Sequence, residues 1–140
     1  MEITKEKLIE KLNGDLAWEY AAAIQYVQHS AVITGPEYEG IQKELIIHAQ
    51  EEMAHAVTLS EQIDYLGGFP AVDVAQIKVD ADSKTLLEYD LEGEGIAIRR
   101  YKERIGQAEA LHMYGLRRAL EDILIQEEEH ERDILSALGR

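Results

Sequence analysis

The sequence predicts an all-α fold, an antiparallel four-helix bundle with one long crossover between its second and third helices. Apolar residues recur at steps of three and four along four segments, as on one face of an α-helix. The chain contains only two prolines, so long helices are permitted. The second and third segments are separated by a stretch without helical periodicity. A stretch of that length inside a compact domain is typical of a crossover.

The first helical hairpin is predicted over residues 4–67. Its first helix starts near Thr4, whose hydroxyl is suited to cap it, and ends near Ile33. Its second helix starts near Pro36, a residue suited to a first helical turn, and ends near Leu66 before consecutive glycines.

The crossover is predicted to follow, up to about Asp82. Its apolar side chains are expected to pack on the bundle, with a short strand as the alternative. These side chains are Val72, Val74, Ile77 and Val79. A second hairpin is predicted over residues 82–138, with a turn near residues 108–112. The two hairpins form one domain over residues 1–140, a length that suits a single sizeable core.

The formal net charge is −14, from 28 acidic and 14 basic residues. Such a charge repels nucleic acid and anionic membranes and suits a protein that attracts cations, although solubility is the simpler explanation. No segment is apolar enough to span a bilayer or to act as a signal peptide, so a cytoplasmic protein without membrane or nucleic-acid partners is expected. The absence of cysteine excludes disulfides, thiolate catalysis and cysteine-ligated metals.

Four acidic stretches lie on the apolar stripes of the predicted helices. They are the single glutamates Glu19 and Glu94, and two Glu-x-x-His runs, Glu52 to His55 and Glu127 to His130. Because residues three apart share one face of a helix, each run can point a carboxylate and an imidazole at one spot. A Glu from each of two helices and a Glu-x-x-His from each of two others form a recurrent di-iron or di-manganese constellation.

The two halves of the chain repeat at an offset of 75 residues. Chance aligns apolar positions readily but seldom aligns acidic, aromatic and histidine residues at one offset. The matching pairs are Asp15 and Asp90, Leu16 and Leu91, Glu19 and Glu94, Tyr26 and Tyr101, Leu45 and Leu120, Glu52 and Glu127, and His55 and His130. The repeat predicts two hairpins related by a pseudo-twofold axis, each supplying half of one site.

Four carboxylates buried in a bundle would be costly unless they were compensated. Two divalent cations would neutralise them, and a carboxylate-rich shell suits iron or manganese, whereas zinc lacks redox chemistry. The sequence therefore predicts two iron ions per chain, with manganese as the alternative. Glu52 and Glu127 are expected to bridge the metals. The terminal ligands are expected to be Glu19, Glu94, His55 and His130.

Tyr26 and Tyr101 lie nearly on the same helix faces as the single glutamates. Tyr26 is the stronger candidate for a catalytic residue, as a hydrogen-bond donor to a ligand or a one-electron relay; a packed phenol is the alternative. Asp90 is interpreted either as orienting a ligand imidazole or as a solvated acid, and Asp15 has no clearer role.

Gly93 and Gly95 flank Glu94 within a predicted helix, where glycine is unfavourable. They are interpreted as making room for an oxidant, as a local bulge, or as allowing close helix approach. His48 lies one turn before Glu52 and is suited to gate or cap the site. His29 and His112 are expected to lie outside it.

At these residues the sequence resembles the bacterioferritin family over nearly the whole chain. The six predicted ligands match that family's ferroxidase centre in identity and nearly in spacing. Gln25-Tyr26, Asp90-Leu91 and Ile123-Leu124 match as well. The resemblance implies an oxidoreductase of the ferroxidase type, which oxidises Fe(II) with O₂ or H₂O₂ in iron storage and detoxification. The alternative is a small di-iron oxidase or rubrerythrin-like peroxidase that stores no iron.

The sequence also departs from related families. Bacterioferritins carry a short fifth helix that helps to line cage openings, and none is predicted before this sequence ends at Arg140. This departure puts a 24-subunit cage in question. The expected partner is a further copy of the chain, in a homodimer or larger homo-oligomer. Ile47 and Glu51 stand where some members have a His and an Asp, which argues against an iron site on an inner surface. Against a rubrerythrin, the chain has no cysteines, and Ala97 replaces that family's extra Glu.

Met53 follows Glu52, and one helical step of about 100° turns it away from the metals. In bacterioferritins a methionine at this position binds a haem shared across a twofold dimer interface. The resemblance therefore implies haem binding by Met53 in a symmetric dimer. The alternative is a methionine that only fills a dimer interface.

Overall fold

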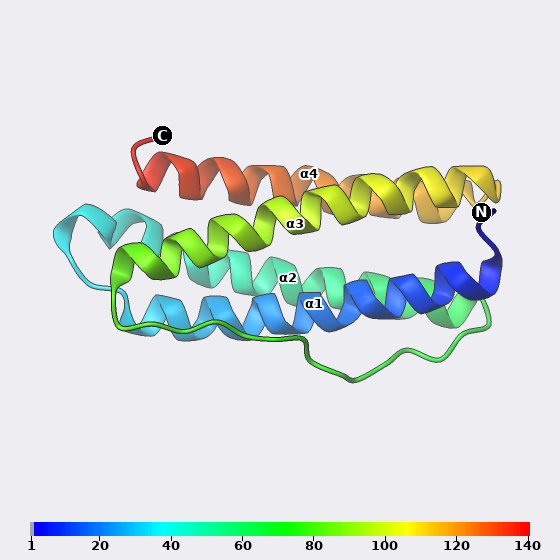
Figure 1. Cartoon of the computed structure of the whole chain (residues 1–140), viewed down its shortest axis with the longest axis horizontal. Coiled ribbons are helices and arrows are strands. Elements are labelled where there is room, and N and C mark those ends of the chain that lie inside the picture. The colour runs from blue at the N-terminus through cyan, green and yellow to red at the C-terminus, as the bar shows by residue number, and fades with distance from the viewer. Residues whose placement is uncertain (1) are drawn as a thin grey trace.

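The computed structural model describes residues 2–140. Its elements in this range are α1 (Lys5–Val32), a 3-10 helix η1 (Pro36–Tyr38), α2 (Glu39–Tyr65), α3 (Ser83–Ala110) and α4 (Tyr114–Ala137). Helices α1 and α2 run antiparallel, and so do α3 and α4 (Figure 1). The connection from α2 to α3 runs back along the bundle, so these two helices point in the same direction. The predicted all-α bundle with one long crossover is therefore confirmed. None of the described helices combines the length and apolar character needed to cross a membrane.

The helix starts are set by local capping. The Thr4 hydroxyl accepts a hydrogen bond from the backbone N–H of Lys7 at 3.2 Å. The Asp82 carboxylate accepts one from the backbone N–H of Thr85 at 3.0 Å and so caps α3. The second helix differs from the prediction, because the turn that starts at Pro36 is a 3-10 helix and α2 begins only after it. Short 3-10 turns of this kind are frequent at helix N-termini.

Most of the apolar side chains expected to pin the crossover do not do so, and only Ile77 among them is half-buried. Three of them are exposed, namely Val72, Val74 and Val79. Hydrogen bonds to α1 hold the crossover instead. The Ala75 N–H donates to the Ala17 carbonyl at 3.0 Å, and the Lys78 N–H donates to Gln25 Oε1 at 2.8 Å. The described part of the crossover forms no strand.

Two apolar clusters fill the two ends of the bundle. The first gathers residues from the start of α1 and the end of α2, including Leu12 and Leu59, with the end of α3 and start of α4. The second gathers residues from the opposite ends of the same helices, including Leu45 and Ile134. A layer at mid-length, between the clusters, is left to polar side chains.

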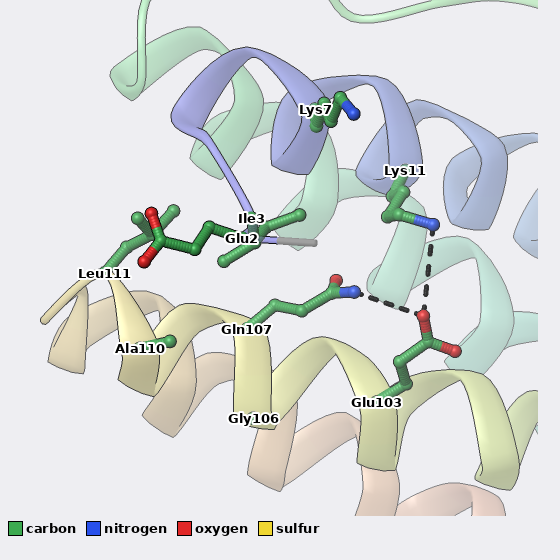
Figure 2. Close-up of a pocket in the computed structure, with 9 residues that line it drawn as sticks. All are labelled: Glu2, Ile3, Lys7, Lys11, Glu103, Gly106, Gln107, Ala110 and Leu111. Carbon is green, nitrogen blue, oxygen red and sulfur yellow. Dashed lines mark hydrogen bonds and ion pairs between the residues drawn. The ribbon is translucent and has the colours of Figure 1, made fainter.

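An open pocket lies at the end of the bundle where α1 begins and α3 ends (Figure 2). On its wall, Lys11 Nζ lies 3.9 Å from Glu103 Oε1, and Gln107 Nε2 donates to the same oxygen at 3.1 Å. None of the predicted metal ligands lines this pocket, so it is separate from the polar layer.

Candidate metal centre

The six residues predicted as ligands lie together in the polar layer at mid-length of the bundle. Their exposed fractions range from 0% for Glu127 to 4% for His55. Their ligand atoms form two groups, within each of which all atoms lie within 4.8 Å of one another. The groups are Glu19, Glu52, His55 and Glu127, and Glu52, Glu94, Glu127 and His130. Glu52 and Glu127 belong to both groups, which is the position that a bridging carboxylate requires.

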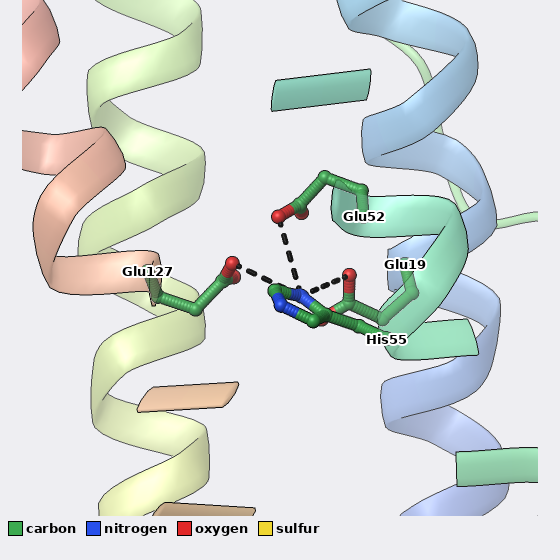
Figure 3. Close-up of side chains that lie close together, drawn as sticks. All are labelled: Glu19, Glu52, His55 and Glu127. Atoms are coloured by element: carbon green, nitrogen blue, oxygen red, sulfur yellow. Dashed lines mark ion pairs between the residues drawn. The ribbon is translucent and has the colours of Figure 1, made fainter. Parts of the chain in front are cut away.

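Each histidine points one ring nitrogen into its group. His55 Nδ1 lies 3.4 Å from Glu19 Oε2, 3.5 Å from Glu52 Oε1 and 3.4 Å from Glu127 Oε1 (Figure 3). Three helices, α1, α2 and α4, therefore bring their side chains to a single imidazole nitrogen.

The second histidine has an equivalent environment. His130 Nδ1 lies 3.1 Å from Glu52 Oε1 and 3.5 Å from both Glu94 Oε1 and Glu127 Oε1. The single glutamate of α3 takes the place that Glu19 of α1 has in the first group. The two groups thus follow the offset found in the sequence.

The other ring nitrogen of each histidine, Nε2, has a hydrogen-bond partner outside the two groups. His55 Nε2 donates to Gln126 Oε1 at 2.5 Å, and His130 Nε2 donates to Glu51 Oε1 at 3.4 Å. Such bonds fix the tautomer that leaves Nδ1 free to bind a metal. Sequence reasoning missed both partners. The available signal was their position, because each directly precedes a glutamate shared by the two groups, and they are also 75 residues apart.

Within the part of the chain that the structure describes, the atoms that face one another across the groups lack hydrogen-bond partners. They are Glu19 Oε2, Glu52 Oε1, Glu94 Oε2, both Glu127 carboxylate oxygens, and Nδ1 of His55 and His130. Buried polar atoms are nearly always hydrogen-bonded, so this concentration of unpaired donor atoms requires an explanation. Carboxylate oxygens and imidazole nitrogens in this ratio fit two divalent metal ions. The buried cluster is therefore consistent with a di-metal site.

Without metal, the centre retains protons at neutral pH. Burial, followed by the charge of neighbouring glutamates, raises the pKa of Glu19 to about 6, of Glu94 to about 7 and of Glu127 to about 8. Burial alone would lower the pKa of His130, but the carboxylates of Glu52 and Glu94 raise it to about 11. Metal ions must displace these protons.

We predict that metal binding releases protons, and fewer of them as the pH rises from about 6 to about 9. Calorimetric titration with Zn(II) in two buffers of different ionisation enthalpy measures the number. The same raised pKa values mean that the folded metal-free protein holds protons more tightly than the unfolded chain. The contribution of Glu19, Glu94 and Glu127 to stability therefore falls as the pH rises from about 5 to about 8. Proton release that is absent at every pH would contradict the assignment.

Both tyrosines hold a carboxylate from the opposite hairpin. The Tyr26 hydroxyl donates to Glu94 Oε1 at 2.5 Å, and the Tyr101 hydroxyl donates to Glu19 Oε1. Burial, and then the nearby carboxylates, raises the pKa of both phenols well above the ordinary value, so both keep their protons. The preference for Tyr26 over Tyr101 at the sequence level has no counterpart in these contacts.

The two aspartates are neither solvated nor in contact with a predicted ligand histidine. Asp90 Oδ2 lies 2.9 Å from Nδ1 of the buried His29, and Gln25 donates to Asp90 Oδ1 at 2.9 Å. Asp15 accepts two hydrogen bonds from the Arg104 guanidinium, at 2.7 and 3.0 Å. The interpretation of Asp90 as orienting a ligand imidazole is wrong, because His29 occupies its carboxylate. His29 itself lies outside both groups, as expected.

A small cavity of about 60 Å³ borders the carboxylate side of the centre. It is lined by the four glutamates together with Gly93 and Ala97. The helix α3 is regular through Gly93, and a Cβ added there would meet no atom within 4 Å. The alternatives of a bulge and of close helix approach at Gly93 are therefore wrong. The cavity is large enough for a water molecule or a small oxidant.

His48 covers the histidine side of the centre. Its ring stacks on that of His130 with centroids 4.0 Å apart, and only 1% of the residue is exposed. Its Nε2 lies 3.1 Å from Asp133 Oδ2. His112, in contrast, is exposed and contacts Tyr114, so it lies outside the centre as expected.

Comparison with known proteins gives a consistent result. A family model described as a ferritin-like domain matches residues 9–140. The chain is similar to a bacterioferritin of Brucella melitensis biotype 1, with 31% identity over 140 residues that cover 95% of this chain and 87% of the relative. It is also similar to a bacterial ferritin of Synechocystis sp., with 32% identity over 139 residues covering 96% and 88% of the two chains.

A solved structure gives the same result for the fold. It is a crystal structure described as ferritin-like, diiron-carboxylate proteins from Bacillus anthracis str. Ames. The two structures superpose with a TM-score of 0.89 at 34% sequence identity, and the match covers 96% of each chain.

Proposed function

Because the chain belongs to the ferritin-like family, we propose that it is a ferroxidase that oxidises Fe(II) with O₂ or H₂O₂. The observation that carries the proposal is the set of unpaired ligand atoms in two groups that share Glu52 and Glu127. The proposed metal ligands are Glu19, Glu52, His55, Glu94, Glu127 and His130. Iron is the proposed metal, because carboxylate-rich shells suit iron and the reaction requires a redox-active ion.

Two Fe(II) ions are the electron donors in this reaction. Each loses one electron, and one H₂O₂ molecule takes up both electrons and two protons to give two molecules of water. The protein holds the two substrate ions side by side, so that both electrons can be delivered in one encounter. Tyr26 and Tyr101 keep Glu94 and Glu19 oriented by hydrogen bonds, and the cavity beside Gly93 supplies room for the oxidant.

The proposal is tested by adding Fe(II) to the metal-free protein without oxygen and then mixing with O₂ or H₂O₂. We expect a fast rise in ferric absorbance that His55→Ala abolishes. His112→Ala is the matched control, because His112 is exposed and contacts no residue of the centre. Oxidation no faster than that of free Fe(II) in the same buffer would rule out a ferroxidase.

Tyr26→Phe is predicted to slow Fe(II) oxidation while leaving the metal content unchanged. The variant removes the hydroxyl that donates to Glu94 and keeps the ring, so the ligand remains but is less firmly oriented. Rates under O₂ and H₂O₂ and metal analysis measure the two effects. Tyr101→Phe is the matched comparison, since its hydroxyl holds Glu19. If Tyr26→Phe reacts at the wild-type rate with both oxidants, the phenol serves only packing.

Iron storage is the proposed role of the reaction. The competing role is that of a di-iron oxidase or rubrerythrin-like peroxidase that deposits no iron. Particle size in solution separates them, because a storage shell is a large closed homo-oligomer, whereas a non-storing enzyme needs only a dimer. Elution as a small oligomer that retains no ferric core after repeated additions of Fe(II) would favour the second role.

Haem binding is proposed at Met53, which is 45% exposed on the outer face of α2. Met53 borders an apolar groove with Ala23, Ile24, Val27 and Ala49, and an exposed apolar patch is typical of an interface. Across a twofold dimer, each subunit would give one thioether to a shared haem. We predict that haem-reconstituted protein gives a sharp reduced spectrum, which Met53→Leu abolishes. Absence of haem uptake by the wild-type protein would leave Met53 as an interface residue only.

A further inference from the structure

A third cluster of metal-binding side chains lies at the surface between α2 and α4. Glu44, His48 and Asp133 each place one ligand atom within 4.8 Å of the others. None of the three belongs to the two groups of the centre. We propose that this cluster binds a divalent cation and passes it to the di-metal centre. The passage to the centre rests on the proposed function, whereas the binding of the cation does not.

The helix geometry brings the three side chains together. Glu44 and His48 are four residues apart, so they lie one turn apart on the same face of α2. Asp133 of α4 completes the set, with Oδ2 lying 3.1 Å from His48 Nε2. Glu44 and Asp133 are exposed, which leaves room for water molecules in the remaining coordination positions. One imidazole and two carboxylates are a ligand set that suits Fe(II), Mn(II) and Zn(II).

The charges of the cluster are not compensated by the protein. Among the described residues, no lysine or arginine forms an ion pair with Glu44, and Asp133 pairs only with His48. The buried His48 is also incompletely bonded, because its Nδ1 has no hydrogen-bond partner in residues 2–140. A buried imidazole whose Nε2 lies beside two carboxylates without a lysine or arginine partner has the capacity to bind a cation.

The position of the cluster connects it with the centre. The His48 ring stacks on His130 at 4.0 Å, and Nδ1 of His130 faces Glu52 at 3.1 Å. Glu51, which is partly exposed, bonds the other nitrogen of His130. A cation held by Glu44, His48 and Asp133 is thus separated from the centre by two stacked imidazoles. The proposed passage requires these rings to rotate.

The test uses the metal-free protein and Zn(II), which binds such ligands without redox chemistry. We expect the wild-type protein to bind about three zinc ions per chain and the double variant Glu44→Gln/Asp133→Asn about two. Both substitutions are at exposed positions, so folding is preserved. The matched control is Glu61→Gln/Glu129→Gln, which removes the same charge from exposed positions on the same helices. Saturation of the wild type at two ions, or three ions in the double variant, would overturn the proposal.

Passage to the centre is measured separately by stopped-flow absorption of Co(II). Loading of the centre should slow roughly tenfold in the double variant and not in the control, as expected when a charged access site is lost. An unchanged loading rate would overturn the passage. Glu127→Gln distinguishes the two proposals: it should remove ions from the centre yet keep the zinc ion that depends on Glu44 and Asp133, whether or not the protein oxidises Fe(II).

Discussion

Glu127→Gln should lower the metal content of the di-metal centre from about two ions per chain to one or none and abolish the oxidation of Fe(II). Glu127 belongs to both groups of ligand atoms, is fully buried, and leaves both carboxylate oxygens unpaired. The substitution keeps the shape of the side chain but replaces a charged oxygen with an amide nitrogen that cannot bind a cation. Metal analysis of the purified variant after iron loading measures the loss.

The control for this variant is Glu129→Gln. Glu129 lies on the same helix but is exposed, so its substitution removes the same charge without touching the centre. The metal-free Glu127→Gln protein should be at least as resistant to heat as the metal-free wild type, because it no longer buries a carboxyl group among like charges. A variant that is folded and still binds as much metal as the wild type would exclude Glu127 as a bridging ligand.

The sequence predicted the bundle and the residues that the structure gathers at its centre because both leave a periodic signal. Leu12, Leu16 and Glu19 occupy one stripe of α1, and a glutamate on an apolar stripe must be buried. The offset of 75 residues then related Glu19 to Glu94. Periodicity gives the face and the depth of a side chain, and these are the quantities that define this site.

The residues that support the site could not be predicted in the same way. Periodicity gives the helix face on which a residue lies but not the residue that it contacts. Predicting the bonds of Gln126 to His55 and of His29 to Asp90 would require the rotation of each helix relative to its neighbours. The prediction that apolar side chains hold the crossover was wrong for a different reason. Its valines suggested packing, but its position is determined by backbone groups, such as the Ala75 N–H, whose partners have no sequence signature.

The two aspartates related by the offset, Asp15 and Asp90, have different partners. Asp15 is flanked by Arg100 and Arg104, whereas Asp90 is flanked by Gln25 and His29, which occupy the equivalent positions of the other hairpin. Arg104 and His29 are both buried. One half of the repeat therefore contains a permanent buried ion pair, and the other a pair whose cation can lose its proton.

Asp15→Ala should therefore lower the free energy of unfolding by about 3–5 kcal/mol, because it leaves Arg104 charged and buried without its carboxylate. Of its polar contacts with described side chains, Arg104 would retain a hydrogen bond to Gln107 and a long contact with the exposed Glu103. Denaturant unfolding at a fixed protein concentration, with a chelator present, measures the loss without any contribution from bound metal.

The matched comparison is Asp90→Ala, with an expected loss of about 1–3 kcal/mol. Burial alone lowers the pKa of His29, and the hydrogen bond and charge of Asp90 raise it above its ordinary value. Without Asp90 the ring becomes neutral and keeps the contact of Nε2 with the Lys78 carbonyl at 2.8 Å. The guanidinium of Arg104 has no such neutral form, so Asp15→Ala should be less stable than Asp90→Ala. Equal losses for the two substitutions would mean that the charge of Arg104 is solvated by rearrangement around it.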